Sequence, residues 1–322
     1  MTNISKTDKI SSKNMRAYIV GGYIPNGGTY MAYQLGRILH EDHGIEVIIV
    51  NVNEETPNHN IFYYPFVFDT IHLKDLESTT TLNDLLIVNP SFSSHMIGLN
   101  CLGKKLMYVQ DFKTFSIIDG FFDYYVSVSQ FVADFLYTTY HLKAPVIPAC
   151  IFLRDFPPSI SWNKKSDKII VPILKHQPYI KAVLNEFCSR YKEQFFDIQN
   201  KMIIIDKKID QNDLINLINQ HRYLLSLSPA EGFGLVPLEA MACGTAVIGF
   251  DGMGGTEYMH DNINSSTSRY PDIEGLVIKT HQLLSDPSLA EKIAKNGKIT
   301  AQKYDFPYFR ERWNRVFEQL IN

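Results

Sequence analysis

Short runs of β-branched and aliphatic residues alternate with helical stretches along most of this chain, and this alternation limits the possible folds more than any other feature. Predicted strands lie at 17–20, 46–50, 85–88, 106–109 and 124–127 in the first half, and at 169–173, 202–205, 223–226 and 246–250 in the second. Predicted helices occupy 29–40 and 130–140, then 180–191, 272–284 and 289–303. Such alternation is typical of parallel sheets covered by helices on both faces, so the expected fold class is α/β.

A break in this pattern divides the chain near its middle. Between residues 150 and 168, Pro157, Pro158 and a polar stretch interrupt any regular period. Because 322 residues suit two domains, we expect one α/β domain over 17–155, a second over 156–303 and a hinge in the interrupted stretch. A flexible tail is predicted over 1–16. A last amphipathic helix is predicted over 304–322, with apolar residues at helical spacing that indicate packing: Phe309, Trp313, Val316, Phe317 and Leu320.

Charge and cysteine content exclude several classes of protein. Lysine and arginine total 31 against 34 acidic residues, a formal net charge of -3, so no chain-wide positive field exists to hold nucleic acid. The four cysteines lack zinc-ligand spacing, which indicates buried thiols in a reducing compartment and no metal site. Neither a signal-like segment in the first sixteen residues nor a membrane-spanning apolar run is found. These features predict a cytoplasmic protein, for which peripheral contact with a membrane surface stays open.

The densest chemical signal runs from Ser226 to Phe250, Ser-Leu-Ser-Pro-Ala-Glu-Gly-Phe-Gly-Leu-Val-Pro-Leu-Glu-Ala-Met-Ala-Cys-Gly-Thr-Ala-Val-Ile-Gly-Phe. It predicts a strand, a glycine-bearing loop, a short helix, a turn and another strand. Gly232 and Gly234 allow a ligand to approach the backbone closely, and the helix that opens at Leu235 points its first N–H groups at the loop. Such a helix start attracts anions, and the carboxyl end of a strand is where open α/β sheets bind ligands.

Two carboxylates in this stretch, Glu231 and Glu239, are eight residues apart. Beside a helix start that attracts phosphate they would repel a nucleotide, unless they accept hydrogen bonds from hydroxyl groups instead. A ribose on one side and a hexose on the other would supply such hydroxyls. If this pair of glutamates stood alone, the alternative would be that one lies in an acidic surface loop and the other is an ordinary helical residue. The surrounding glycines, prolines and turn favour the binding role.

The Glu-x7-Glu segment ending in Ala-Met-Ala-Cys-Gly-Thr resembles glycosyltransferase family 4 (group 1) of the GT-B superfamily. The resemblance implies that Glu231 contacts the donor sugar and that Glu239 holds the ribose. It places the backbone N–H groups of Gly232, Phe233, Gly234 and Leu235 near the sugar and diphosphate. Tyr108-Val-Gln-Asp-Phe112 resembles a subgroup that includes bacterial polysaccharide and rhamnosyl-type transferases.

The remaining site candidates come partly from the same resemblance and partly from glycines and polar residues at strand ends and helix starts. Family members carry an Arg and a Lys after the first strand of the second domain, where this chain has Lys175 and Lys181; a lysine lacks the bidentate fork of arginine. Further donor contacts are expected from Gly254 and Gly255, where a strand leads into an expected helix, and from Gly27 and Gly28 at the first helix start. A plain strand-to-helix turn is the alternative for the first pair, and a tight turn that needs glycine is the alternative for the second. Acceptor-side candidates are His95, Gln110 and Asp111; a local hydrogen bond for His95 and a cap for Asp111 are the alternatives.

The resemblance implies two facing Rossmann-like domains with a cleft between them and a C-terminal helix that crosses back. The first domain would take the acceptor and the second the nucleotide sugar. The implied activity is a retaining, metal-independent hexosyltransferase that uses a UDP-, GDP- or TDP-sugar, needs no cofactor, and acts on a glycan or a lipid-linked saccharide. Two alternatives remain at this point: a sugar-nucleotide epimerase of the same architecture, and a non-catalytic transferase-like subunit that binds a glycan or a partner. The sequence does not indicate the oligomeric state.

Overall fold

The computed structural model describes residues 15–53, 55–175 and 177–321. By its internal contacts the chain divides into two compact units. Unit 1 comprises Met1–Tyr108, Thr114–Val126 and Arg310–Asn322, and unit 2 comprises Val109–Lys113 and Ser127–Phe309. Of the tail predicted over 1–16, only Met15 and Arg16 are among the described residues, and Arg16 already belongs to the first strand.

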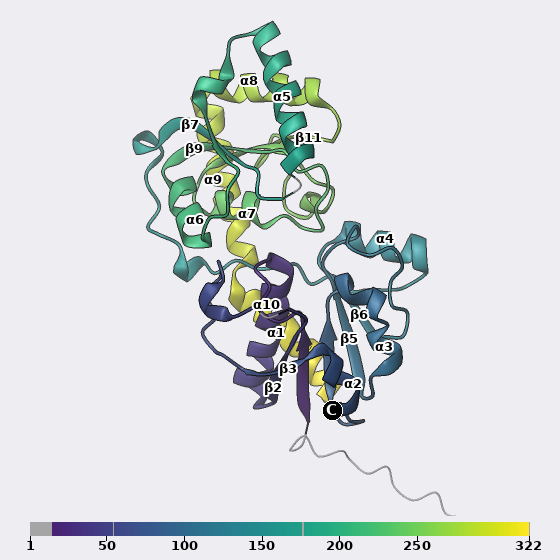
Figure 1. Ribbon diagram of the computed structural model, residues 1–322. Coiled ribbons are helices and arrows are strands. Elements are labelled where there is room, and N and C mark those ends of the chain that lie inside the picture. The colour runs from purple at the N-terminus through teal and green to yellow at the C-terminus, as the bar shows by residue number, and fades with distance from the viewer. Residues whose placement is uncertain (1–14, 54, 176, 322) are drawn as a thin grey trace, which may run out of the picture. The chain divides into compact units, whose positions relative to one another are not determined.

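A six-stranded sheet in the order β3-β2-β1-β4-β5-β6 forms the centre of unit 1 (Figure 1). Its strands are β1 (Arg16–Val20), β2 (Glu46–Asn51), β3 (Asp69–His72), β4 (Leu85–Val88), β5 (Lys104–Val109) and β6 (Tyr124–Ser127). Strand β1 pairs in parallel with β2 and β4, so that Ile19 lies opposite Ile49 on one side and Ile87 on the other. Continuous apolar runs such as these are expected of strands buried on both faces.

Helix α1 (Gly27–His43) is bounded by its own end signals. The side chain of Asn26 accepts a hydrogen bond from the backbone N–H of Thr29 at the start, and Gly44 ends the helix in the left-handed conformation. Residues of α10 (Phe306–Ile321) from Arg310 onward pack along α1: Arg310 forms an ion pair with Glu41 at 2.8 Å. The predicted apolar stripe of α10 is confirmed, since most of its members are buried: Phe309, Trp313, Phe317 and Leu320.

Unit 2 is built on a five-stranded sheet in the order β11-β10-β9-β7-β8. Its strands are β7 (Ser166–Pro172), β8 (Met202–Ile205), β9 (His221–Ser226), β10 (Ala246–Phe250) and β11 (Ser266–Ser268). All of the neighbouring pairs are parallel. The α/β fold with two parallel sheets is thus confirmed.

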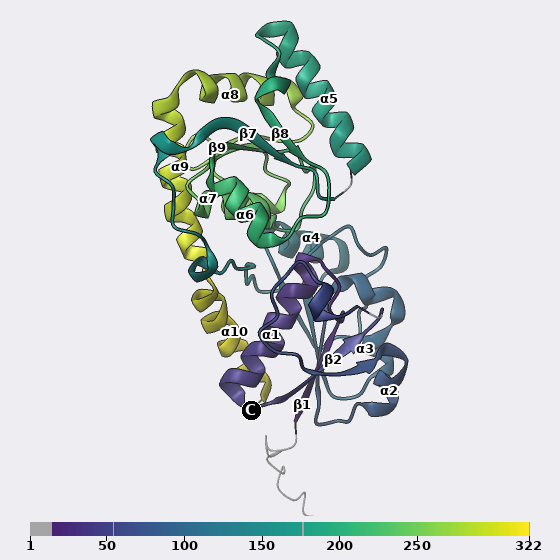
Figure 2. The ribbon, with the colours of Figure 1, turned by 60° about the vertical axis from the view of Figure 1, so that its left-hand side comes forward.

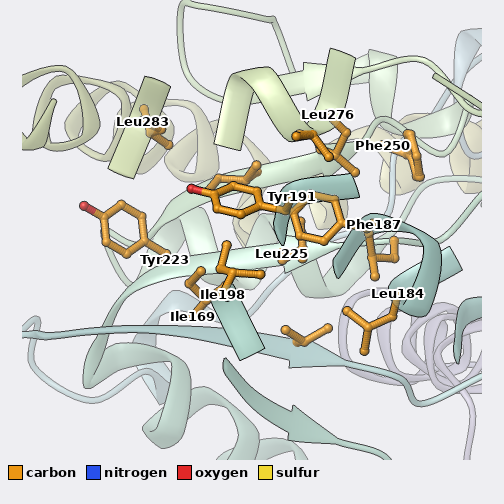
Figure 3. Packing of buried hydrophobic residues seen from close by; sticks show 14 of the residues in the cluster. Ile169, Leu184, Phe187, Tyr191, Ile198, Tyr223, Leu225, Phe250, Leu276 and Leu283 are labelled. Atoms are coloured by element: carbon orange, nitrogen blue, oxygen red, sulfur yellow. The ribbon is translucent and has the colours of Figure 1, made fainter. Parts of the chain in front are cut away.

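The helices of unit 2 are α4 (Gln130–Tyr140), α5 (Gln177–Gln194), α6 (Gln211–Asn219), α7 (Leu235–Ala242), α8 (Ile273–Ser285) and α9 (Pro287–Ala301). Figures 1 and 2 show α5 and α8 on one side of the sheet and α6 and α7 on the other. In the core under α5 and α8, Phe187 and Tyr191 of α5 lie over Leu225 of β9 (Figure 3). Burial of such large side chains is the main favourable term in forming the layer.

Several elements were not predicted from the sequence. Strand β3 is mostly exposed and polar, β11 consists of Ser-Thr-Ser, and α6 is short; the helices α2 (Leu76–Thr79) and α3 (Ile97–Asn100) have a single turn each. The four cysteines are buried and form no disulfide. Among the described residues, no helix combines the length and the apolar character that spanning a membrane requires.

Candidate active site

The candidate site lies in unit 2, where three neighbouring strands end. Strands β10, β9 and β7 are adjacent in the sheet. The loop after β7 carries Lys175, the loop after β9 carries Glu231, and the loop after β10 runs through Gly252 and Gly254. Because parallel strands end at the same edge, these loops converge, as expected of the ligand-binding edge of an α/β sheet.

The loops after β9 and β10 are joined by their backbones. The N–H of Glu231 donates to the carbonyl of Gly252 at 2.7 Å, and the N–H of Gly254 donates to the carbonyl of Glu231 at 3.1 Å. A Cβ atom on Gly254 would collide with the carbonyl of Gly232, and one on Gly232 would collide with the carbonyl of Gln110. Glycine is therefore required at both positions by close backbone approach.

Alternate carbonyl groups of the Glu231 loop are held by side chains from other segments. Lys113 donates to the carbonyl of Ala230, the hydroxyl of Ser129 donates to that of Gly232 at 2.7 Å, and the hydroxyl of Tyr258 donates to that of Gly234. In a trans peptide the N–H points opposite to the preceding carbonyl. The N–H groups of Phe233 and Leu235 therefore point away from the anchoring hydroxyls.

Helix α7 begins directly at this loop. Gly234 is its N-cap, with a φ of 86° that favours glycine, and no side chain among the described residues caps the helix. The third helical residue, Pro237, has no N–H, so the unsatisfied donors of the first turn are those of Leu235 and Val236. The first turn also holds no acidic residue. The predicted start of this helix at Leu235 is confirmed. With these donors the helix start is suited to an anion.

Glu231 and Lys175, two predicted site residues, lie close together. Glu231 Oε2 is 3.9 Å from Lys175 Nζ, and Glu231 Oε1 accepts a hydrogen bond from the hydroxyl of Ser228 at 2.9 Å. The Lys175 side chain is 59% exposed and that of Glu231 is 24% exposed. At such exposure the ion pair stabilises the fold little, and both groups remain accessible to a ligand.

Lys181, the second predicted cation, has different surroundings. It lies on α5, and its Nζ forms an ion pair with Asp206 Oδ2 at 2.8 Å, just beyond the end of β8. The hydrogen bond from Lys181 lowers the pKa of the Asp206 carboxyl. The charge of Lys181 is therefore already compensated within the protein, whereas Lys175 faces the Glu231 loop.

Glu239, on α7, is only 3% exposed. Its Oε1 accepts a hydrogen bond from Gln211 Nε2 at 2.8 Å. Burial raises the pKa of the Glu239 carboxyl, and the hydrogen bond from Gln211 opposes that rise. A buried carboxylate at the ligand edge is a common feature of functional sites.

The other predicted residues lie as follows. Gly27 and Gly28 open α1 in unit 1, and His95 ends a short 3-10 helix of that unit, where its ring contacts Phe92. Gln110 and Asp111, expected on the acceptor side within 17–155, are grouped by their contacts with unit 2, because their backbone packs against Gly232. Asp111 accepts from the N–H of Lys113 at 2.8 Å and so closes a turn.

Gly254 and Gly255 differ from expectation in one respect. They open a 3-10 helix, η8 (Gly254–Glu257), where an ordinary helix was predicted. The predicted helix is limited to one 3-10 turn, because Tyr258, with a φ of -138° and a ψ of -18°, leaves the helical conformation and ends it.

Sequence reasoning missed four residues that shape this site: Ser129, Gln211, Ser228 and Tyr258. Ser228 lies inside the recognised segment, three residues before Glu231, and its spacing was an available signal. The others come from distant parts of the chain, so only the fold reveals them.

Comparison with known proteins identifies the segment that carries this site. Residues 189–300 match the family model described as Glycosyl transferases group 1. One curated relative is an N,N'-diacetylbacillosaminyl-diphospho-undecaprenol alpha-1,3-N-acetylgalactosaminyltransferase of Campylobacter jejuni, 27% identical over 111 residues, which are 34% of this chain and 30% of that protein. Another is a poly(glycerol-phosphate) alpha-glucosyltransferase of Bacillus subtilis, 31% identical over 98 residues, 30% of this chain and 15% of that protein. The matches thus span less than a third of either relative.

Solved structures extend the likeness to nearly the whole chain. A glycosyltransferase from Rickettsia africae superposes with a TM-score of 0.71 at 18% identity, covering 96% of this chain and 99% of that one. HepE from Anabaena, in complex with UDP and glucose, superposes with a TM-score of 0.71 at 13% identity, covering 95% and 100%. The chain therefore has the α/β fold of these GT-B structures, and its match to the group 1 model lies within unit 2.

Proposed function

We propose that this chain is a retaining, metal-independent glycosyltransferase of family 4, which moves a hexosyl group from a nucleotide-diphosphate sugar to a glycan or a lipid-linked saccharide. One observation carries the proposal: Glu231, Lys175 and the uncapped start of α7 lie together at the edge formed by β7, β9 and β10. That arrangement offers a carboxylate, a cation and backbone donors within one loop cluster. The loops after β9 and β10 lie within the matched group 1 segment, and the loop after β7 precedes it in the chain.

The donor diphosphate would bind at the start of α7. The N–H groups of Phe233 and Leu235 and the ammonium group of Lys175 would stabilise the charge that develops as the bond to the sugar breaks. These groups would do the work that a metal ion does in other transferases. The Glu231 carboxylate would accept hydrogen bonds from the sugar, and Glu239 would accept one from the ribose.

Transfer would break the bond between the anomeric carbon and the diphosphate oxygen and form a bond to the acceptor oxygen on the same face. The acceptor proton would pass to the departing diphosphate. Retention follows from the family resemblance, as does the donor-side role of Lys181. The proposal also includes acceptor-side roles for His95, Gln110 and Asp111 and donor-side roles for the glycines at helix starts: Gly27, Gly28, Gly254 and Gly255.

The relatives favour particular substrates. HepE binds UDP, which makes a UDP-sugar the first donor to try, with GDP- and TDP-sugars next. The names of the curated relatives contain a diphospho-undecaprenol and a poly(glycerol-phosphate), which support a lipid-linked or polymeric acceptor. A cytoplasmic enzyme with an acceptor domain over 17–155, a donor domain over 156–303 and a crossing helix over 304–322 completes the proposal.

Nucleotide release tests this function. The purified chain is incubated with UDP-, GDP- and TDP-sugars in the presence of a chelator, and the free nucleoside diphosphate is measured. We expect slow release from one donor and a loss of at least about a hundredfold in Glu231→Ala. Glu291→Ala is the matched control, because Glu291 forms an ordinary ion pair with Lys295 on the surface of α9.

The outcome separates this function from its alternatives. Conversion of the donor into its epimer would indicate an epimerase. Failure of the wild-type chain to release nucleotide from any donor, together with failure to bind one, would contradict the proposal and favour a non-catalytic subunit.

A further inference from the structure

Glu239 has one of its two carboxylate oxygens occupied by a protein group. Oε1 accepts the hydrogen bond from Gln211 Nε2 at 2.8 Å. Oε2 accepts no hydrogen bond from the residues that the structure describes. A carboxylate that binds both vicinal hydroxyls of a ribose would use its two oxygens side by side. Here one of the two lone pairs of Oε1 is taken by Gln211, so Oε2 is the more open acceptor.

The Gln211 amide is held in place by a packed helix. Gln211 is the first residue of α6, and the apolar face of that helix is buried through Leu214, Ile215 and Ile218. The same helix is tied to the end of α7: Thr245, three residues after α7, donates its hydroxyl to the carbonyl of Ile218 at 3.0 Å. The helix that carries the donor Gln211 and the helix that carries the acceptor Glu239 are thus linked to each other.

We propose that Gln211 is a positioning residue that fixes the Glu239 carboxylate so that Oε2 takes the stronger hydrogen bond from a hydroxyl of the bound nucleotide. This inference rests on the proposed function, because it takes Glu239 as the group that meets the ribose. It adds that the two ribose hydroxyls are recognised unequally. A nucleotide that lacks the hydroxyl facing Oε2 should bind weakly, and one that lacks the other hydroxyl should bind nearly as well as the parent.

Gln211 also affects the charge of its partner. Burial raises the pKa of Glu239, and the amide opposes the rise by donating to the ionised form. Without the amide, the pKa of Glu239 rises further. Nucleotide binding that needs the carboxylate would then be lost at a higher pH as the solution is acidified.

The experiment uses the full chain and titrates it with UDP, 2′-deoxy-UDP and 3′-deoxy-UDP, or with the matching guanosine series if the wild type binds GDP in place of UDP. In the wild type we expect one deoxy analogue to bind within about twofold of the parent and the other to bind about tenfold more weakly. Gln211→Leu should weaken binding of the parent about tenfold and reduce the difference between the analogues. As the pH is lowered, Gln211→Leu should lose nucleotide binding at a higher pH than the wild type does.

Two further variants separate positioning from a loss of folding. In a Glu239→Ala background, Gln211→Leu should cause no further loss, because the bond it removes is already absent. Gln194→Leu is the matched control: Gln194 Nε2 donates to Glu274 Oε1 at 2.6 Å on the exposed surface of α5, and its removal should leave all three dissociation constants unchanged.

The results distinguish failure of the Gln211 inference from failure of the proposed function. Equal weakening by both deoxy analogues in the wild type, or an unchanged dissociation constant in Gln211→Leu, would overturn this inference and leave the proposed function standing. If the wild type bound neither UDP nor GDP, the proposed function itself would fail and the inference with it.

Discussion

At the scale of single residues, the two lysines that the sequence predicts to stabilise the leaving diphosphate differ in their surroundings. Lys175 Nζ lies 3.9 Å from Glu231 Oε2 in the loop cluster, whereas Lys181 forms a 2.8 Å ion pair with Asp206. We expect Lys175→Ala to lower kcat about a hundredfold, because it removes the cation of the loop cluster that would stabilise the leaving diphosphate. Lys181→Ala should lower kcat less than about tenfold, since Asp206 already offsets that charge. Steady-state nucleotide release measures both, and equal losses would contradict this distinction.

The residues that bear chemistry were predictable to different degrees. Glu231, Glu239 and the glycines between them stand in one continuous segment, so their proximity follows from local spacing. Ser129 and Tyr258, which hold the carbonyls of Gly232 and Gly234, come from other loops, and no local pattern marks them. A hydrogen bond between distant segments depends on how strands are ordered in the sheet, and a single sequence carries little information about that order.

At the scale of elements, helices with clear end signals were predicted best. Gln130–Tyr140 was predicted at its observed bounds, where Ser129 caps the start and His141 ends the helix in the left-handed conformation. Strands with apolar runs, such as β4 and β10, were also predicted at their observed bounds. The missed strand β11 has the sequence Ser-Thr-Ser, and it is buried because it pairs with β10. The β-propensity of single residues does not report such pairing.

The far end of α7 depends on a buried lysine. Lys165 donates to the carbonyl of Cys243, the C-cap residue of α7, at 2.9 Å and lies 3.2 Å from the Thr245 hydroxyl. Burial lowers the pKa of Lys165 to about 8. The folded chain therefore loses this proton at a lower pH than the unfolded chain does, and the contribution of Lys165 to stability rises with pH above about 8.

This dependence can be measured by urea unfolding of the wild type and Lys165→Met at pH 7 and pH 9. Relative to the variant, the wild type should gain about 1 kcal/mol of unfolding free energy over that interval. Lys164→Met, which alters an exposed neighbour, should retain the wild-type dependence. An identical pH dependence in the wild type and Lys165→Met would show that burial does not lower the pKa of Lys165.

At the scale of the whole molecule, the alternation of strands and helices predicted the α/β fold, and two parallel sheets confirm it. The grouping of segments was less predictable. Residues 110–113 directly follow strand β5, most of which belongs to unit 1, yet their contacts place them in unit 2, where Gln110 packs against Gly232. Hydrophobic periodicity reports which residues are buried, but it does not report which of two sheets a connecting loop contacts.

The central claim is that a nucleoside diphosphate binds through the backbone of the Glu231 loop and the start of α7. Hydrogen–deuterium exchange of the full chain, with and without saturating UDP or GDP, tests it most directly. With nucleotide bound, we expect slower exchange in peptides that cover residues 228–239 than in the free chain, because the ligand would engage the N–H groups of Phe233 and Leu235. Unchanged exchange in those peptides, at a nucleotide concentration shown to saturate binding, would contradict it.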